Sequence, residues 1–183
     1  MKEIVERIKT LLSTCEEPVI VSIEGGAGSG KTTLAAALHK ALGGNVYHMD
    51  DFFLPPHLRT EERLAAPGGN VDYDRFYGEV VEGIFSDEPF SYGIFDCSVG
   101  RITRQRMAHP TDLHIVEGVY SAHPYYEEIY SLRIFLDVDA ETQQKRILER
   151  NGDKAPMFFE KWIPMENRYF AAFSVREKSD IIL

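Results

Sequence analysis

"IVSIEGGAGSGKTTLAAAL", residues 20–38, passes from an apolar segment through a glycine-rich turn into an alanine-rich segment. The turn at 25–32 matches the whole pattern G-x-x-x-x-G-K-[ST]. Glycines lack Cβ atoms, so backbone N–H groups can converge on phosphate oxygens, and a following helix adds its positive end. We therefore expect a strand, a phosphate-binding loop and a helix here. The alternative is a chance glycine-rich turn between a strand and a helix.

The loop residues are candidates for contacts with a nucleotide. Lys31 can reach the β- and γ-phosphates, and the hydroxyl of Thr32 can ligate Mg²⁺. ATP and Mg²⁺ are the cofactors that this loop implies, with the choice between ATP and GTP left open. The nucleotide contacts expected from the segment are Gly26, Ala27, Gly28, Ser29, Gly30, Lys31, Thr32 and Thr33.

The composition is that of one ordinary globular protein. The chain has 183 residues, of which 44% are hydrophobic and 27% are charged. This length suits a single domain over 1–183 with its own core and leaves little room for further domains. The net charge of −9 argues against a nucleic-acid backbone as the main partner.

The N-terminal segment predicts an amphipathic helix rather than a signal peptide, because apolar residues such as Ile4, Ile8 and Leu11 share one stripe. No apolar run approaches the roughly 20 residues that span a bilayer. Cys15 and Cys97 lie far apart without metal-binding spacing, so reduced thiols are expected and a disulfide is the alternative. We expect a soluble, cytoplasmic protein with no membrane partner, and a homo-oligomer stays open.

Strand and helix signals alternate along the chain, which predicts an α/β fold: the three-layer P-loop NTPase fold, with a mainly parallel sheet and helices on both faces. One long irregular stretch, 54–71, is expected to be a surface loop. Strands are expected at 19–24, 45–50, 92–96, 113–118, 132–138 and 180–183, and helices from Lys31 to Gly43, at 72–85, at 140–151 and at 157–173, the last interrupted near Pro164.

Acidic residues stand where several of these strands end. Parallel sheets bind ligands beyond the carboxyl ends of their strands, so the loop, Asp50, Asp51, Asp96 and Glu117 are expected to lie together. Asp50 could accept the proton of an attacking hydroxyl or orient that hydroxyl. Glu117 could hold Mg²⁺ directly or through water. The alternative is that these acids are solvated loop residues that cap turns.

Arginines could stabilise the charge of a transferred phosphoryl group. Arg146 and Arg150 lie four residues apart on one face of the helix predicted at 140–151, which could close over a nucleotide as a lid around 146–160. The alternative is a solvated basic face. Arg101 belongs to a second basic cluster at 100–106, for which an exposed turn is an equal alternative.

Acids and aromatic residues could also form an acceptor site. Asp72 and Asp74 begin the helix predicted at 72–85; one is expected to be its N-cap, and the other could accept hydrogen bonds from a vicinal diol. Aromatic side chains could wall a ring-shaped substrate, although most of them are expected in the core. They are Phe52, Phe53, Tyr73, Tyr92 and Phe95.

With these residues described, the chain resembles the uridine kinase and phosphoribulokinase family of P-loop kinases from about Val19 to Leu183. "GGAGSGKTT" looks like the family's phosphate loop, "MDDFF" is similar to its D-S/D-F-Y motif, and "NVDYDRF" looks like N-F-D-x-P-x-A-F. "IVEGVY" resembles its E-G-I motif, "RILER" its lid helix and "SDIIL" its last strand.

The resemblance implies roles for individual residues. Asp50 takes the place of the base that lies near Mg²⁺, and Glu117 that of the acid on the metal side. Asp72 takes the place of the acid that binds ribose hydroxyls, and Phe53 that of the aromatic residue of the D-S/D-F-Y motif. Arg146, and less surely Arg150, take the place of the lid arginines.

Two segments depart from the family pattern. Uridine kinases usually carry Y-D-F-x-x-H-x-R, but this chain has "FDCSVGR", which keeps Phe95 and Asp96 in kind, lacks the histidine and displaces Arg101. The lid run E-R-G-R is replaced by "RNGDKAP". These departures affect the expectation that the chain has a pocket for a pyrimidine.

The expected function is phosphoryl transfer from ATP to a hydroxyl of a small metabolite, with Lys31, Asp50 and Arg146 as the catalytic residues. Uridine or cytidine leads among the acceptors, with pantothenate, nicotinamide riboside or a sugar phosphate as alternatives. A GTPase switch would need N-K-x-D and D-x-x-G, which the sequence lacks. A module that binds nucleotide without chemistry is the other alternative.

Overall fold

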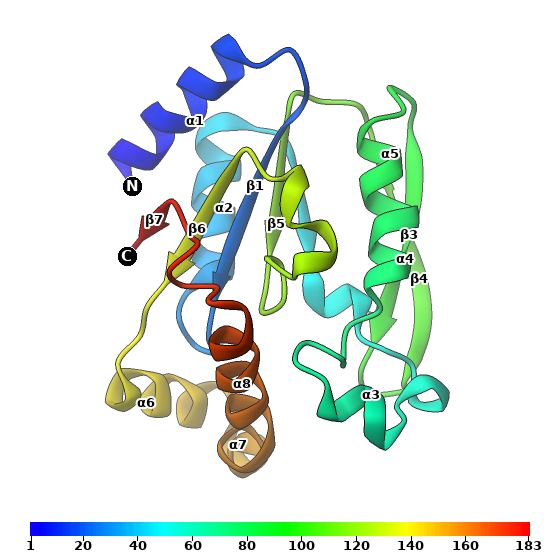
Figure 1. Ribbon diagram of the computed structural model, residues 1–183, viewed down its shortest axis with the longest axis vertical. Helices are drawn as coiled ribbons and strands as arrows, with labels where there is room; N and C mark the ends of the chain where they lie inside the picture. The colour runs from blue at the N-terminus through cyan, green and yellow to red at the C-terminus, as the bar shows by residue number, and fades with distance from the viewer.

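A parallel sheet of five strands forms the centre of the molecule (Figure 1). The computed structural model describes residues 1–183, apart from the side chain of residue 127. In spatial order, the strands are β2 (Asn45–His48), β5 (Leu113–Glu117), β1 (Val19–Gly25), β6 (Leu132–Leu136) and β7 (Ile181–Ile182). All four strand pairs are parallel, so the predicted α/β class with a mainly parallel sheet is confirmed.

The central strand β1 pairs with β5 along one edge and with β6 along the other, and all of its residues are buried. Its two faces are covered by different elements of the chain. Alternate side chains of a strand point to opposite faces of the sheet. Val21 and Ile23 accordingly pack in one hydrophobic cluster, and Ile20 packs in another. The apolar run before the glycine loop is explained by this double burial.

One face of the sheet is covered by α1 (Lys2–Thr14) and α2 (Lys31–Leu42), whose side chains Ile4, Ile8 and Leu38 join the cluster of Val21 and Ile23. The amphipathic N-terminal helix is thus confirmed. Helix α2 ends before Gly43, which has a φ of 75°. Such a left-handed φ suits glycine and ends the helix as predicted.

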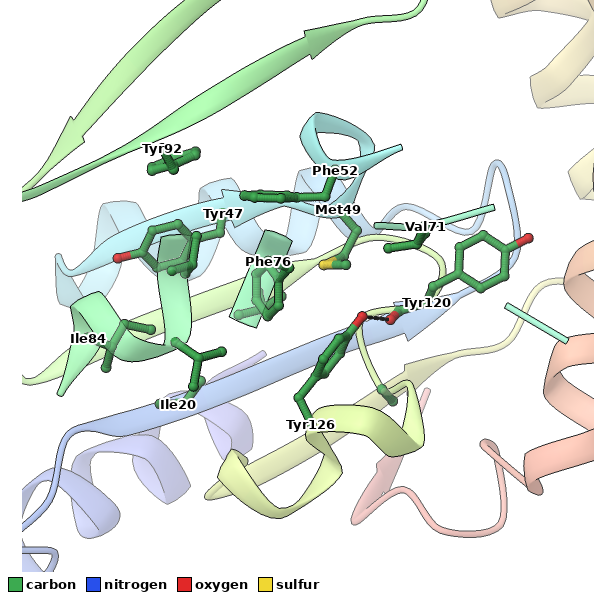
Figure 2. Packing of buried hydrophobic residues seen from close by; sticks show 14 of the residues in the cluster. Ile20, Tyr47, Met49, Phe52, Val71, Phe76, Ile84, Tyr92, Tyr120 and Tyr126 are labelled. Atoms are coloured by element: carbon green, nitrogen blue, oxygen red, sulfur yellow. Dashed lines mark hydrogen bonds between the residues drawn. The ribbon is translucent and has the colours of Figure 1, made fainter. Parts of the chain in front are cut away.

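The other face carries a larger aromatic cluster (Figure 2). Phe76 is fully buried, with its ring edge-on to Phe52 at 5.1 Å between centroids. Tyr92 stacks on Phe52 from the opposite direction, with 5.8 Å between centroids. Figure 2 shows these side chains between the sheet and the elements that cover it. Most of the candidate aromatic residues therefore belong to the core.

The helix predicted at 72–85 forms, but with a wider turn in its middle. It consists of α4 (Tyr73–Phe76), a π-helical turn η3 (Tyr77–Val81) and α5 (Glu82–Ile84). A hairpin, β3 (Phe90–Asp96) with antiparallel β4 (Arg101–Ala108), follows it and stands outside the central sheet. The placement of Asp96 at the edge of the parallel sheet was therefore wrong, and residues 100–106 form an exposed strand rather than a turn.

The second half of the chain supplies helices beside the carboxyl end of the sheet (Figure 1). They are α6 (Ala140–Asn151), η5 (Gly152–Lys154), α7 (Ala155–Met157), the π-helical turn η6 (Phe158–Trp162) and α8 (Ile163–Phe173). Before them, η4 (Pro124–Ile129) leads into β6. The interruption expected near Pro164 takes the form of the π-helical turn η6, which ends directly before α8. Pro164, which has no N–H, is the second residue of α8.

The segment 54–71 is more ordered than a surface loop. It contains η2 (Pro56–Leu58) and α3 (Glu61–Ala65), and η1 (Met49–Phe52) precedes it. The Arg63 guanidinium donates to the carbonyl oxygens of Gly69 (2.9 Å) and Val71 (3.1 Å), and also contacts the Tyr73 hydroxyl. One arginine thus ties the segment to the start of α4.

Cys15 and Cys97 are both free and exposed, as expected. Within the part of the chain that the structure describes, no helix has the length and apolar character needed to cross a membrane.

Phe76→Ala should lower the free energy of unfolding by about 3–5 kcal/mol, because it leaves a cavity beneath Phe52. Urea denaturation at constant pH measures this loss. Phe85→Ala, the same change at a side chain that is 47% exposed, should cost well under half as much. Equal losses from the two variants would contradict the packing described here.

Candidate active site

The phosphate loop begins where β1 ends and leads into α2. The Lys31 side chain folds back over it, and its ammonium donates to the carbonyl oxygens of Gly25 (2.7 Å) and Gly26 (2.9 Å). Gly30, with a φ of 103°, is the N-cap of α2, and no side chain caps this helix end. The first N–H groups of a helix have no intrahelical partner. This end of α2 is therefore equipped to bind an anion.

Thr32, Glu117 and His48 are joined by hydrogen bonds at the ends of three neighbouring elements. The Thr32 hydroxyl donates to Oε1 of Glu117 (3.2 Å), and Nδ1 of His48 lies 2.5 Å from the same oxygen. This hydrogen bond is the main reason that the pKa of His48 is raised. The approach of β5 to β2 depends on Gly118, since a Cβ there would lie 2.7 Å from that of Met49.

Asp50 lies in η1, beyond the end of β2, and faces the same region. Its pKa is raised because protein atoms desolvate the carboxyl group and the Glu117 carboxylate lies nearby; Lys31 opposes the shift. The side chain nevertheless remains exposed to solvent. Asp51 is half-buried, and its Oδ2 is buried without a hydrogen-bond partner among the described residues. The structure thus brings Asp50 to the loop and the strand end that carries Glu117.

Glu24, at the end of β1, was missed in the sequence. It is fully buried and accepts hydrogen bonds from the N–H of Gly25 (2.9 Å), the N–H of Ala122 (3.1 Å) and the hydroxyl of Tyr169 (3.1 Å). Burial raises its pKa to about 7, and these hydrogen bonds and Lys31 oppose the shift. A lone acid in an otherwise apolar strand, one residue before the glycines, is the signal that could have found it.

Glu166, in the first turn of α8, was also missed, and no local pattern in the sequence marks it. Its Oε2 accepts a hydrogen bond from the N–H of Ala27 in the loop (2.9 Å). The carbonyl oxygen of Ala27 accepts a hydrogen bond from Nε2 of Gln143 in α6 (2.9 Å). Ala27 is therefore held on both sides by helices from the second half of the chain.

Both candidate arginines of α6 lie near the loop. The guanidinium of Arg146 donates to the carbonyl oxygens of Gly28 (2.9 Å) and Ser29 (3.4 Å). Arg150 lies over the ring of Phe158, 5.7 Å from its centroid, and its charge lowers the pKa of Asp50 and Glu166. Arg146 thus contacts the loop directly, and Arg150 lies close enough to influence Asp50 and Glu166 by its charge.

The residues proposed for the acceptor are less closely grouped. Asp72 is the N-cap of α4 and accepts from the N–H of Arg75 (3.2 Å), while Asp74 accepts from the hydroxyl of Tyr125 (2.6 Å). Phe95 is buried in β3. Arg101 is exposed at the start of β4.

Two other aromatic contacts border this region. Arg59 lies over the ring of Phe95, 5.9 Å from its centroid. Phe53 bridges to Val71 and packs against the aromatic cluster. Asp72 therefore has the capping role that the sequence allowed, and the structure does not bring Arg101 into contact with the loop residues.

Comparison with known sequences identifies relatives. A family model described as the NB-ARC domain matches residues 1–50, the part that contains the phosphate loop. A uridine kinase from Anoxybacillus flavithermus is 25% identical over 187 residues, which cover 92% of this chain and 86% of that protein. Uridine kinase-like protein 4 from Arabidopsis thaliana is 28% identical over 145 residues, covering 74% of this chain and 30% of that longer protein.

Solved structures share the fold over almost the entire chain. A structure described as a possible uridine kinase from Bacillus stearothermophilus has a TM-score of 0.69 at 19% identity, covering 99% of both chains. A fructose transport system kinase from Silicibacter sp. TM1040 has a TM-score of 0.74 at 20% identity, covering 98% of both chains. The sequence relatives make this chain similar to uridine kinases, and the parallel sheet with its phosphate loop has the fold of the solved kinase structures.

Proposed function

We propose that this protein transfers the terminal phosphoryl group of ATP to a hydroxyl group of a small metabolite. The observation that carries the proposal is the convergence of Lys31, Thr32, Asp50 and Glu117 at one edge of the sheet. A phosphate loop alone serves many kinds of protein. An acid beside the loop, in reach of an attacking hydroxyl, is what a kinase adds to it.

The donor set suits Mg²⁺ bound together with a nucleotide. Thr32, Glu117 and Asp50 offer a hydroxyl and two carboxylates, which are the hard oxygen ligands that Mg²⁺ prefers. Desolvation and the nearby Glu117 carboxylate raise the pKa of Asp50, and a bound cation would favour its ionised form. No cluster of three or more His, Cys, Asp or Glu side chains among the described residues could hold a metal by itself. Nucleotide phosphates and water would complete the coordination, as is usual for Mg²⁺.

The remaining groups have complementary roles in the proposed transfer. Asp50 orients the acceptor hydroxyl and takes up its proton. Lys31 and Arg146 stabilise the negative charge that spreads over the transferred group, since both already lie on the loop. Residues 146–160, with Arg150, would act as a lid that excludes water over the nucleotide.

A nucleoside is the leading acceptor, because several relatives are uridine kinases. Asp72, Phe53 and Phe95 would line its site, with Asp72 bound to the ribose hydroxyls and Arg101 reaching the acceptor from the hairpin. The hairpin turn departs from the uridine kinase pattern, so pantothenate, nicotinamide riboside and a sugar phosphate are the alternatives. Measuring ADP release over a panel of nucleosides and other hydroxylated metabolites will distinguish them.

Lys31→Ala should lower acceptor-dependent ADP release at least about 100-fold, because the loop loses its cation. A coupled ADP assay with MgATP measures the rate. Lys40→Ala, which removes an exposed lysine near the other end of α2, is the matched control and should keep near wild-type turnover. Unchanged turnover in Lys31→Ala would refute the assignment of the loop.

Asp50→Asn should leave MgATP affinity within a few-fold of wild type but reduce transfer to the acceptor by about 10²–10⁴-fold, the usual contribution of a general base. Binding is measured by calorimetry and transfer by ADP release. Asp51→Asn makes the same change one residue further along and should affect transfer far less. If the Asp50 variant transfers as well as wild type, this carboxylate is not the base.

Asp72→Asn should raise the KM for the acceptor by a much larger factor than the KM for ATP, because an amide accepts fewer hydrogen bonds from a diol than a carboxylate does. Asparagine keeps the N-cap of α4, so the fold should be preserved. Steady-state kinetics with each substrate varied in turn gives both constants. Equal changes in the two KM values would rule out a role specific to the acceptor.

A further inference from the structure

The carboxylate of Glu166 occupies a position on the phosphate loop. Its Oε2 accepts the N–H of Ala27, and a Cβ built on Gly26 would lie 3.6 Å from this oxygen. The side chain is buried, with 6% of the residue exposed. Loops of this sequence bind phosphate through backbone N–H groups, and here one such group is already bound to an anion of the protein itself.

The charges that face Glu166 come from each element packed around it. Lys31 in α2 and Arg150 in α6 stabilise its ionised form, whereas Asp50 in η1 destabilises it. The phenol of Tyr120, which follows β5, also lies within its electrostatic reach. Desolvation outweighs the favourable contacts and raises the pKa of Glu166 to about 7. Glu166 is therefore close to its titration midpoint at neutral pH even without a ligand.

A phosphate group at the loop would compete with this carboxylate. Both are anions, and the charge of Lys31 favours both. Glu166 already accepts a loop N–H from a buried position. Two negative charges close together in a buried site repel each other strongly. Binding is therefore favoured when one of the two groups is neutral or moves away. Glu166 is the group that can become neutral, since a proton from solvent converts it to a carboxyl whose carbonyl oxygen still accepts the Ala27 N–H.

We propose that Glu166 sets the affinity of the loop for nucleotide, with the phosphates binding to the form of the protein in which Glu166 is protonated. This inference rests on the proposed function, because it assumes that the loop binds a nucleotide. Each nucleotide bound above neutral pH takes up one proton from solvent, which forms an O–H bond on the carboxylate; no other group is released. Glu166 is thus a residue that positions the loop and controls its charge, rather than a catalytic residue.

The affinity for nucleotide should depend on pH, because the ionised form of Glu166 opposes binding. Below pH 7 Glu166 is already protonated and binding needs no further proton. Above pH 7 the proton must be supplied, so affinity falls as pH rises. With a pKa of about 7 in the free protein, and with Glu166 held protonated by the bound phosphates as proposed, the affinity should fall about tenfold from pH 6 to pH 8.

Calorimetric titration with MgATP, without acceptor, tests the proposal at pH 6 and pH 8 in two buffers of different ionisation enthalpy. Wild type should lose about tenfold in affinity and take up roughly 0.9 protons per nucleotide at pH 8. Glu166→Gln keeps an oxygen acceptor for Ala27 but cannot ionise. It should take up no proton and bind MgATP about tenfold more tightly than wild type at pH 8.

Gln143→Ala is the matched control, since it removes the hydrogen bond to the carbonyl oxygen of Ala27 without changing a charge. It should keep the pH dependence and the proton uptake of wild type. If Glu166→Gln binds MgATP with the pH dependence of wild type, or if Gln143→Ala loses that dependence, the inference is overturned while nucleotide binding stands.

The proton count in wild type keeps the inference testable if Glu166→Gln does not fold. No proton uptake at pH 8 in a protein that binds MgATP would overturn the inference by itself. A wild-type protein that does not bind MgATP at all would instead refute the proposed function, and the inference with it.

Discussion

The ammonium group of Lys31 is the charge on which the rest of the site depends. It holds the loop in shape through the carbonyl oxygens of Gly25 and Gly26, and it is the common cation for Glu24, Asp50 and Glu166. Three carboxyl groups would not gather round a loop of glycines without a compensating charge. Desolvation raises the pKa of all three carboxyl groups, and the charge of Lys31 opposes this shift only in part. A site in this condition favours a bound cation, a proton, or both.

The fold supplies this arrangement in two parts. The parallel sheet brings the ends of β1, β2 and β5 together, and with them Glu24, Asp50 and Glu117. Helices α6 and α8, which come more than a hundred residues after the loop, then hold Ala27 through Gln143 and Glu166. The loop is thus fixed from both its own strand and the C-terminal helices. Motion of α6 or α8 would therefore displace Ala27 and the loop around it.

The side proposed to bind the acceptor is built differently. It depends on η1, the segment 54–71 and the hairpin of β3 and β4, rather than on the ends of the central strands. Arg63 and Arg59 stabilise these segments by contacts with carbonyl oxygens and aromatic rings. These segments could therefore differ from those of a uridine kinase without a change in the sheet or the loop. The departure of "FDCSVGR" from the uridine kinase pattern lies in this adaptable part.

Local patterns predicted the central sheet, the loop and most helices, because each is encoded by a run of apolar residues or by glycines at fixed spacing. Asp50, Glu117 and Arg146 could be predicted because they follow a strand or lie on a helix face. The hairpin was missed because pairing of residues 101–108 with β3 is not visible in a polar segment. The π-helical turn η3 within the helix predicted at 72–85 has no sequence signal. Glu166 could not be found, since its partner Ala27 lies 139 residues away.

The central claim is that the loop and Asp50 act together on a hydroxyl acceptor. The most direct measurement is mass spectrometry after incubation with ATP labelled with ¹⁸O in its γ-phosphoryl group and a mixture of hydroxylated metabolites. The account predicts a small molecule that gains one phosphoryl group carrying the label, with none formed by Lys31→Ala or Asp50→Asn. Label that remains in ATP, or that appears only in inorganic phosphate, for every acceptor class would contradict it.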